Sequence, residues 1–348
     1  MKAAIFKVKG KIAVEEQPKP KIKESTDAIV HVVLACVCGS DLWYYRGIEE
    51  HIEGPIGHEF IGVVDKIGSD VKDIKKGDFV IAPFAFSDNT CPHCQAGFQT
   101  ACVNGGFFGM GIEGDGGQAE YVRVPQAGGT LVAVPGSDFS DETLVSLLTL
   151  SDVMGTGYHA AMSSGVKEED TVAVVGDGAV GLSGVLSAKL LGAKRIIVLG
   201  STHESRKKLA VEWGADNFID ARGEEAVNTV MKLTSRVGAD AVLECVGTRQ
   251  ANDTAFAIAR PGAIVGRSGV PHDVQIDATG TFFRNVGMRG GPAPAREYLP
   301  RLMDTVLQDK INPGKIFDFE TDLDHIQGAY AAMDERRAIK SLVRVSDV

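Results

Sequence analysis

The chain has 348 residues, more than one ordinary hydrophobic core accommodates, so we expect two domains. Its 44% hydrophobic and 24% charged residues are ordinary for a globular protein, and its net charge of −10 disfavours nucleic acid, whose phosphates need clustered lysine and arginine. No apolar run approaches the roughly 20 residues of a membrane span, and no signal peptide precedes the first strand-like segment. We therefore expect a cytoplasmic protein that binds neither nucleic acid nor membrane.

The first 150 residues or so are typical of a β-rich domain. Short apolar segments are separated by Gly, Pro and Asp, which predicts strands over 28–34, 60–64, 79–82 and 121–124. The longest intervening loop runs from residue 84 to residue 117. Loops of this length in a compact domain are usually functional.

From residue 151 onward, apolar strands alternate with helices. We predict strands over 171–175, 195–199, 241–243 and 263–265, with helices over 179–191 and 204–213. This alternation predicts a parallel, doubly wound sheet, so the fold class is α/β. After residue 292 the pattern is mixed again, with helices over 299–307 and 326–333 and a strand over 341–345.

A glycine-rich loop joins the first strand of this α/β region to its first helix. It reads Gly176, Asp177, Gly178, Ala179, Val180 and Gly181. The first glycine permits a tight turn, the second lets the backbone approach a pyrophosphate, and the third lets the helix pack on the sheet. The helix N-terminus then offers free N–H groups to phosphates. The loop predicts a dinucleotide-binding site.

The end of the second strand indicates which dinucleotide is bound. A carboxylate there would bind the ribose 2′-hydroxyl of NAD, but the segment after Leu199 contains none. It offers hydroxyl, imidazole and guanidinium groups instead, from Ser201, Thr202, His203 and Arg206. We therefore expect NADP(H). The alternative is that Ser201 and Thr202 only begin a loop and cap the next helix.

Five of the six cysteines fall in the first third of the chain, which favours metal binding or catalysis over disulfides. Three short segments are distinctive: Cys38-Gly39-Ser40-Asp41, Gly57-His58-Glu59, and the run that begins Ser151-Asp152. Together, and upstream of a dinucleotide fold, they resemble the medium-chain zinc-dependent alcohol dehydrogenases over essentially the whole chain. The resemblance is greatest to the NADP-dependent secondary alcohol dehydrogenases and formaldehyde-dehydrogenase-like enzymes.

This resemblance implies a GroES-like catalytic domain, residues 1–152 and 293–348, and a Rossmann domain, residues 153–292, with the active site in the cleft between them. It implies that Cys38, His58 and Asp152 bind the catalytic Zn²⁺, and that Glu59 either binds the ion or sits just behind it. Thiolate, imidazole and carboxylate all suit zinc, and a catalytic site keeps one position open.

The resemblance also assigns roles around the metal. Ser40 matches a hydroxyl that contacts the substrate oxygen and begins a proton relay. The relay usually continues to a histidine five residues after the cysteine ligand, where this chain has Trp43. Trp43 and Phe84 are expected to line the substrate pocket. Four further residues are equally compatible with pocket or core, namely Phe86, Phe107, Phe108 and Met110.

Relatives often hold a second, structural zinc with four cysteines, three spaced by three residues and the last eight further on. Cys91 and Cys94 fit this spacing, but Gly97 and Gly105 fall at the remaining places and Cys102 lies between them. Either His93 or Asp88 could complete a site with the three thiolates. We call the segment that carries Cys91, Cys94 and Cys102 the cysteine lobe. We expect about one zinc per chain, with the site in the cysteine lobe empty or partly filled. Cys36 and Cys245 are expected to be small buried hydrophobes.

The sequence thus predicts a zinc-dependent oxidoreductase that transfers hydride between NADP(H) and an alcohol/aldehyde or ketone pair. It is expected to form a homo-oligomer, either a dimer or a tetramer, with only small molecules as further partners. Two alternatives remain: a zinc-free quinone or enoyl reductase on the same fold, and a non-catalytic NADPH-binding regulator. The joint presence of Cys38, His58, Asp152 and Ser40 argues against both.

Overall fold

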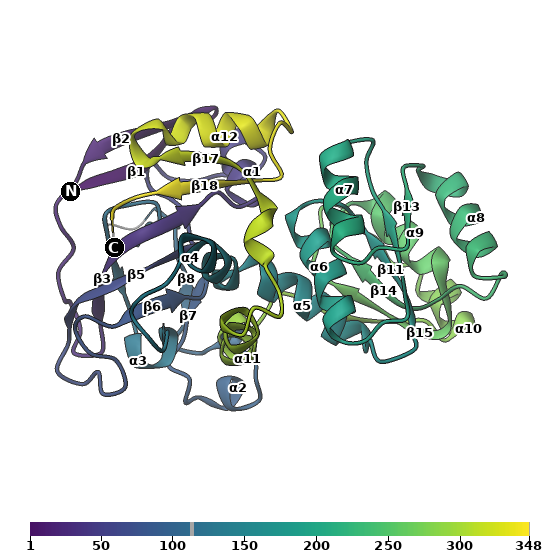
Figure 1. Ribbon diagram of the computed structural model, residues 1–348, viewed down its shortest axis with the longest axis horizontal. Coiled ribbons are helices and arrows are strands. Elements are labelled where there is room, and N and C mark those ends of the chain that lie inside the picture. Colours follow the sequence, from purple (N-terminus) through teal and green to yellow (C-terminus); the bar gives the residue numbers. More distant parts are fainter. Residues whose placement is uncertain (112–114, 348) are drawn as a thin grey trace. The chain divides into compact units, whose positions relative to one another are not determined.

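The computed structural model describes residues 1–111 and 115–347 and divides into two compact units (Figure 1). The mixed-sheet unit comprises Met1–Asp152 and Pro294–Val348, and the parallel-sheet unit comprises Val153–Ala293. Each unit has its own apolar core. Among the described residues, no helix combines the length and the apolar character that crossing a membrane requires.

The parallel-sheet unit contains one six-stranded sheet in the order β13-β12-β11-β14-β15-β16. All of its strand pairs are parallel. The strands are β11 (Thr171–Val175), β12 (Arg195–Leu199), β13 (Asn217–Ile219), β14 (Ala239–Glu244), β15 (Ala259–Arg267) and β16 (Gly287–Gly290). The order reverses between β11 and β14, and ligands of such sheets bind at this reversal. This confirms the predicted doubly wound α/β class.

Helices connect these strands because parallel neighbours require long crossovers. Contacts join α5 to α6 and α6 to α7, and separately join α8 to α9. The helices are α5 (Val153–Ser164), α6 (Ala179–Leu190), α7 (Glu204–Glu212), α8 (Gly223–Leu233), α9 (Arg249–Ile258) and α10 (Ala278–Arg284). The central strands are nearly continuous apolar runs because helices cover them on both faces.

The mixed-sheet unit is built on a seven-stranded sheet in the order β10-β6-β5-β3-β18-β17, with β9 paired to β3. Its strands are β3 (Ala28–Cys36), β5 (Phe60–Ile67), β6 (Phe79–Ala82), β9 (Tyr121–Val124), β10 (Val132–Ala133), β17 (Phe317–Asp322) and β18 (Lys340–Arg344). Two smaller sheets accompany it, formed by β1 (Lys2–Val8), β2 (Lys11–Glu16) and β4 (Gly54–Pro55), and by β7 (Ala85–Phe86) and β8 (Gly106–Phe107). The C-terminal β18 lies antiparallel to β3, with Leu342 opposite Cys36.

The helices of this unit are short, apart from α11 (Ala295–Leu307). They are α1 (Asp41–Arg46), α2 (Pro92–Gln95), α3 (Ala127–Thr130), α4 (Asp141–Leu148) and α12 (Ile326–Asp334), with 3-10 turns η1 (Gln99–Ala101), η2 (Thr149–Ser151), η3 (Pro313–Ile316) and η4 (Leu323–His325). We expected residues 84–117 to form one long loop. The segment instead contains four short elements: the strands β7 and β8, the helix α2 and the 3-10 turn η1.

Candidate functional site

Three side chains expected to bind metal come together in the mixed-sheet unit. Cys38 follows β3, His58 precedes β5, and Asp152 follows η2. The Asp152 Oδ2 lies 3.8 Å from Cys38 Sγ and 3.4 Å from His58 Nε2. One donor atom from each of these residues and one from Glu59 lie within 4.8 Å of one another.

The separations between these donor atoms fit a zinc ion. Zinc bonds of about 2.3 Å to sulfur and about 2.0 Å to nitrogen or oxygen, at tetrahedral angles, place S and O about 3.5 Å apart and N and O about 3.3 Å apart. The separations of 3.8 Å for Cys38–Asp152 and 3.4 Å for His58–Asp152 are close to these values. Thiolate, imidazole and carboxylate are also the donor types that a catalytic zinc takes.

The ionisable groups of the cluster are close enough to shift one another's pKa values. Burial raises the pKa of the Cys38 thiol, and the Glu59 carboxylate raises it further. Burial alone would lower the pKa of His58, but Asp41 and Cys38 raise it well above its usual value. A bound divalent cation allows such buried groups to be deprotonated together, because metal binding releases their protons.

A buried carboxylate that we assigned no role supports two of these side chains. The Asp41 Oδ2 accepts hydrogen bonds from the Cys38 backbone N–H at 3.0 Å and from Gln118 at 3.2 Å, while Oδ1 lies 3.4 Å from His58 Nδ1. The Tyr330 hydroxyl donates to Gln118 Oε1 at 2.8 Å. A carboxylate on the second imidazole nitrogen fixes the tautomer and orientation of a metal-binding histidine. The spacing Cys38-x-x-Asp41 was the only sequence signal for it.

Glu59 is held by a buried ion pair on the side of β18. Its Oε1 accepts from Lys340 Nζ at 2.7 Å, and the side chains of Glu59 and Lys340 are 0% and 1% exposed. The Cys36 thiol donates to Glu59 Oε2 at 3.2 Å, and Lys340 also donates to the Val37 carbonyl at 3.2 Å. Cys36 is therefore buried as expected but also contacts the site, whereas Cys245 is only partly buried.

The other residues expected at the site take different positions. Ser40 is the N-cap residue of α1, but its side chain makes no capping hydrogen bond. Trp43 lies on the same helix and is partly buried. The Phe84 ring meets the His58 ring edge-on, with centroids 6.3 Å apart, and stacks on Phe107 at 6.0 Å. Phe84 thus lies beside a candidate ligand.

The four aromatic and apolar residues whose role the sequence left open divide into two groups. Phe108 is 2% exposed and packs between Phe60 and Phe86, with centroids 5.3 and 5.6 Å away, so it belongs to the core. Phe107 and Met110 are 43% and 46% exposed. Phe86 is partly buried and packs against the same core as Phe108. Phe107 and Met110 are therefore the two of the four with the most surface open to a ligand.

The cysteine lobe has a register that differs from the expected one. Asp88, Cys91, Cys94 and Cys102 bring one donor atom each to within 4.8 Å of one another. Their positions reproduce the spacing of three, three and eight residues once Asp88 takes the first place. The register that put Gly97 and Gly105 at the third and fourth places is therefore shifted by one ligand, and of the two candidates for completing the site it is Asp88, not His93, that joins the thiols.

The geometry of this lobe also fits a closed metal site. The Cys91 Sγ lies 3.6 Å from Cys94 Sγ and 3.9 Å from Cys102 Sγ, near the roughly 3.8 Å between two sulfurs on one tetrahedral zinc. Asp88 Oδ1 accepts from the backbone N–H groups of Thr90 and Cys91 at 2.8 and 3.0 Å. Burial opposes its ionisation, but these N–H groups lower the pKa of Asp88 overall.

The glycine-rich loop has the shape that a pyrophosphate requires. Gly176 has φ +112°, a left-handed conformation that side chains disfavour. A Cβ on Gly181 would lie 2.1 Å from the Gly176 carbonyl oxygen, whereas a Cβ on Gly178 would meet nothing within 4 Å. The backbone at Gly178 is therefore open to a ligand at the N-terminus of α6, and the loop fits a dinucleotide.

The segment after β12 contains a feature that the sequence did not reveal. Asp177, from the glycine-rich loop, accepts hydrogen bonds from the backbone and the hydroxyl of Ser201 at 2.7 and 2.5 Å. The N-cap residue of α7 is His203, so the alternative that Ser201 or Thr202 caps this helix is wrong. Thr202 is exposed, and Arg206 is partly buried and faces Asp177.

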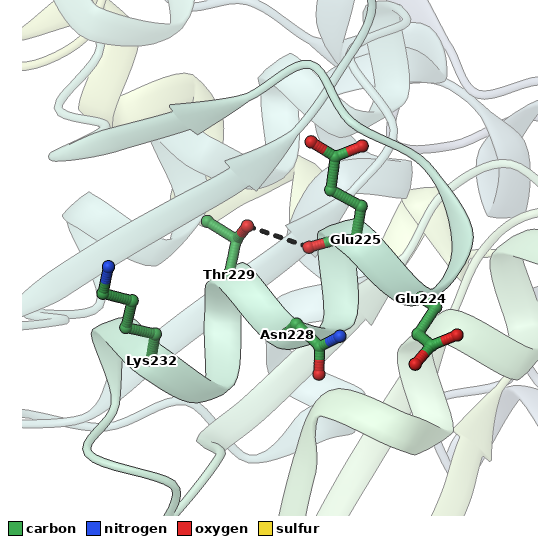
Figure 2. Close-up of a pocket in the computed structure, with 5 residues that line it drawn as sticks. All are labelled: Glu224, Glu225, Asn228, Thr229 and Lys232. Atoms are coloured by element: carbon green, nitrogen blue, oxygen red, sulfur yellow. Dashed lines mark hydrogen bonds between the residues drawn. The ribbon is translucent and has the colours of Figure 1, made fainter.

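The described surface also has a hollow over α8, with a volume of about 440 Å³. Figure 2 shows that its five lining side chains all project from this one helix: Glu224, Glu225, Asn228, Thr229 and Lys232. No other element contributes a group to it, so it is an exposed helix face and has no part in the site.

Comparisons with known proteins agree with this geometry. Residues 24–136 match the alcohol dehydrogenase GroES-like domain, and residues 179–308 match the zinc-binding dehydrogenase family. The chain is 34% identical to zinc-type alcohol dehydrogenase B of Aspergillus flavus, over 100% of this chain and 82% of that protein.

Two solved structures share the whole fold. Alcohol dehydrogenase TADH from Thermus sp. ATN1 is 31% identical, with a TM-score of 0.92 over 99% of this chain and 100% of that one. A putative zinc-binding dehydrogenase from Sinorhizobium meliloti 1021, bound to NADP, is 27% identical, with a TM-score of 0.83 over 99% and 98%. The chain therefore belongs to the medium-chain zinc-dependent alcohol dehydrogenase family and is a zinc-dependent oxidoreductase.

Proposed function

We propose that this enzyme transfers hydride between NADP(H) and a small alcohol/aldehyde or ketone pair, and acts as a carbonyl reductase. The observation that carries the proposal is the convergence of Cys38, His58 and Asp152 beside the buried Glu59. A zinc ion bound by the three would supply Lewis-acid polarisation of the substrate oxygen. A regulator that only binds NADPH would not need this cluster.

The surrounding side chains then have distinct tasks. Asp41 orients His58 and the Cys38 backbone. Lys340 holds Glu59 back from the three ligands, which leaves one position for substrate. Ser40 takes up or delivers the hydroxyl proton of the substrate. Phe84 and Trp43 are proposed to form apolar walls of the pocket.

We propose NADP(H) as the cofactor, bound by the glycine-rich loop and by Ser201, Thr202, His203 and Arg206. The chain has no carboxylate at the end of β12, and the S. meliloti structure holds NADP. One charge-assisted hydrogen bond to the 2′-phosphate gives a preference of about tenfold or more. We expect kcat/KM for NADPH to exceed that for NADH by at least this factor in steady-state assays with a panel of aldehydes and ketones. Equal efficiency with both cofactors would refute this choice.

We also propose a second zinc in the lobe of Asp88, Cys91, Cys94 and Cys102. This revises the expectation of about one zinc per chain, because Asp88 supplies the fourth ligand that a closed structural site needs. Metal analysis by mass spectrometry should find about two zinc ions per chain, and about one in Asp88→Ala. That variant should retain turnover at moderate temperature and melt at a lower temperature. A single zinc in the unmodified enzyme, unchanged in Asp88→Ala, would contradict the second site.

We further propose that the enzyme works in the cytoplasm as a homo-oligomer. Phe282 and Phe283 on α10 are 75% and 77% exposed. Large aromatic side chains exposed side by side are typical of surfaces that associate. The adjacent β16 is an edge strand of its sheet, which also favours pairing with a second copy.

A further inference from the structure

The ribose end of the cofactor loop carries a negative charge that the strand end alone does not show. Ser201 lies just beyond β12, where dinucleotide folds bind the 2′ position of the adenosine ribose. The fold brings a carboxylate there from the glycine-rich loop. Asp177 is 7% exposed, and its Oδ2 takes both hydrogen-bond donors of Ser201, at 2.7 and 2.5 Å.

Asp177 also engages the guanidinium expected to bind the phosphate. Arg206 Nη1 lies 3.7 Å from Asp177 Oδ1 and donates to its backbone oxygen at 3.4 Å. One buried carboxylate therefore takes both donors of Ser201 and faces the Arg206 guanidinium. A 2′-phosphate, with nearly two negative charges at neutral pH, would have to compete for these groups beside a like charge.

A second guanidinium, that of Arg222, reaches the segment after β12 from the loop that follows β13. Arg222 lies between β13 and α8, and its Nη1 donates to the Gly200 carbonyl and, at 3.2 Å, to the Ala221 carbonyl. Arg222 is exposed, and among residues 1–111 and 115–347 it forms no ion pair with a carboxylate. A guanidinium has five N–H donors, so several are left for a ligand.

From this arrangement we infer that Arg222 is a further cation that binds the 2′-phosphate, and that Asp177 limits the preference for NADPH over NADH. The inference rests on the proposed use of NADP(H) and names the two residues that set its strength. Asp177 acts by competing for Ser201 and Arg206. Arg222 acts by direct charge-assisted hydrogen bonds, because within residues 1–111 and 115–347 its guanidinium is bound to carbonyl oxygens only.

The test is cofactor affinity, measured by calorimetry on the zinc-loaded enzyme without substrate. Asp177→Asn should raise the ratio of the NADH and NADPH dissociation constants about tenfold over the unmodified enzyme, the scale of one charge-assisted bond. Arg222→Gln should weaken NADPH about tenfold and leave NADH within about twofold. Glu169→Gln is the matched control, because it removes the same charge from an exposed side chain before β11, at the opposite end of that strand from the glycine-rich loop, and should leave the ratio within about twofold.

An unchanged ratio in Asp177→Asn, or equal weakening of both cofactors in Arg222→Gln, would overturn the inference. Arg222 is exposed, so its replacement is compatible with folding. If Asp177→Asn does not fold, the affinities measured on Arg222→Gln decide the inference by themselves. The unmodified enzyme separates the two proposals. A ratio near one there refutes the NADPH preference, whereas the inference depends only on how the variants shift that ratio.

Discussion

Cys38→Ser is expected to lose the catalytic zinc and nearly all turnover while still binding cofactor. The serine hydroxyl is a far weaker zinc donor than a thiolate, and the other proposed ligands, His58 and Asp152, would hold the ion without a sulfur donor. The glycine-rich loop belongs to the parallel-sheet unit, so NADPH affinity should be preserved. Metal analysis should find one zinc fewer per chain than in the unmodified enzyme, whether or not the cysteine lobe is filled.

Asp41→Asn provides a graded comparison for this experiment. The amide keeps the size of Asp41 but loses the charge that faces His58, 3.4 Å away. Loss of such a partner usually lowers metal affinity by about 10- to 100-fold. Added zinc should therefore restore turnover in Asp41→Asn and fail to restore it in Cys38→Ser. Full activity of a metal-free preparation of the unmodified enzyme would refute the catalytic role of the cluster.

Ser40→Ala is expected to lower turnover by about 10²- to 10⁴-fold, the usual contribution of a positioned acid–base group. The Ser40 side chain makes no capping hydrogen bond in α1, so its removal should cost little stability. Trp43 stands where the family resemblance predicts a relay histidine, so in the proposed mechanism the proton passes from Ser40 by another route. Trp43→His should therefore change the pH profile of turnover more than its maximum.

The matched control is Ser140→Ala. Ser140 caps α4 by accepting a hydrogen bond from the Thr143 N–H at 3.2 Å, and loss of such a cap costs about 1 kcal/mol of stability. This variant should melt earlier and keep its turnover, the reverse of the result for Ser40→Ala. Steady-state kinetics with thermal unfolding on both variants makes the comparison. If Ser40→Ala turns over normally, the proton assignment is wrong.

The local patterns of the sequence predicted much of the fold. The strands at Thr171–Val175 and Arg195–Leu199 have the expected bounds, because strands buried on both faces are continuous apolar runs. The helix at Val153–Ser164 was missed. Its apolar residues surround it without a periodic face, so no helical stripe marked it.

The site was predictable only where its residues follow a known spacing. Cys38, His58 and Asp152 could be named for this reason, and the structure brings them together. Asp177 reaches Ser201 across 24 residues, and no local pattern predicts such a contact. Asp88 was one of two candidates for completing the cysteine lobe, and the sequence could have selected it, because it lies three residues before Cys91 and completes the spacing.

The ion pair between Glu59 and Lys340 also orders the assembly of the protein. The two residues are 281 positions apart, and the whole parallel-sheet unit lies between them in the sequence. In the folded protein the buried Glu59 carboxylate is paired with Lys340 of β18, and burying that charge without its partner would cost about 3–5 kcal/mol, so the site around His58 is stable only once β18 has paired with β3. During synthesis on a ribosome the proposed metal ligands emerge before the parallel-sheet unit, and the segment that neutralises their neighbour emerges after it. The proposed catalytic centre is thus completed only after the intervening unit has been made.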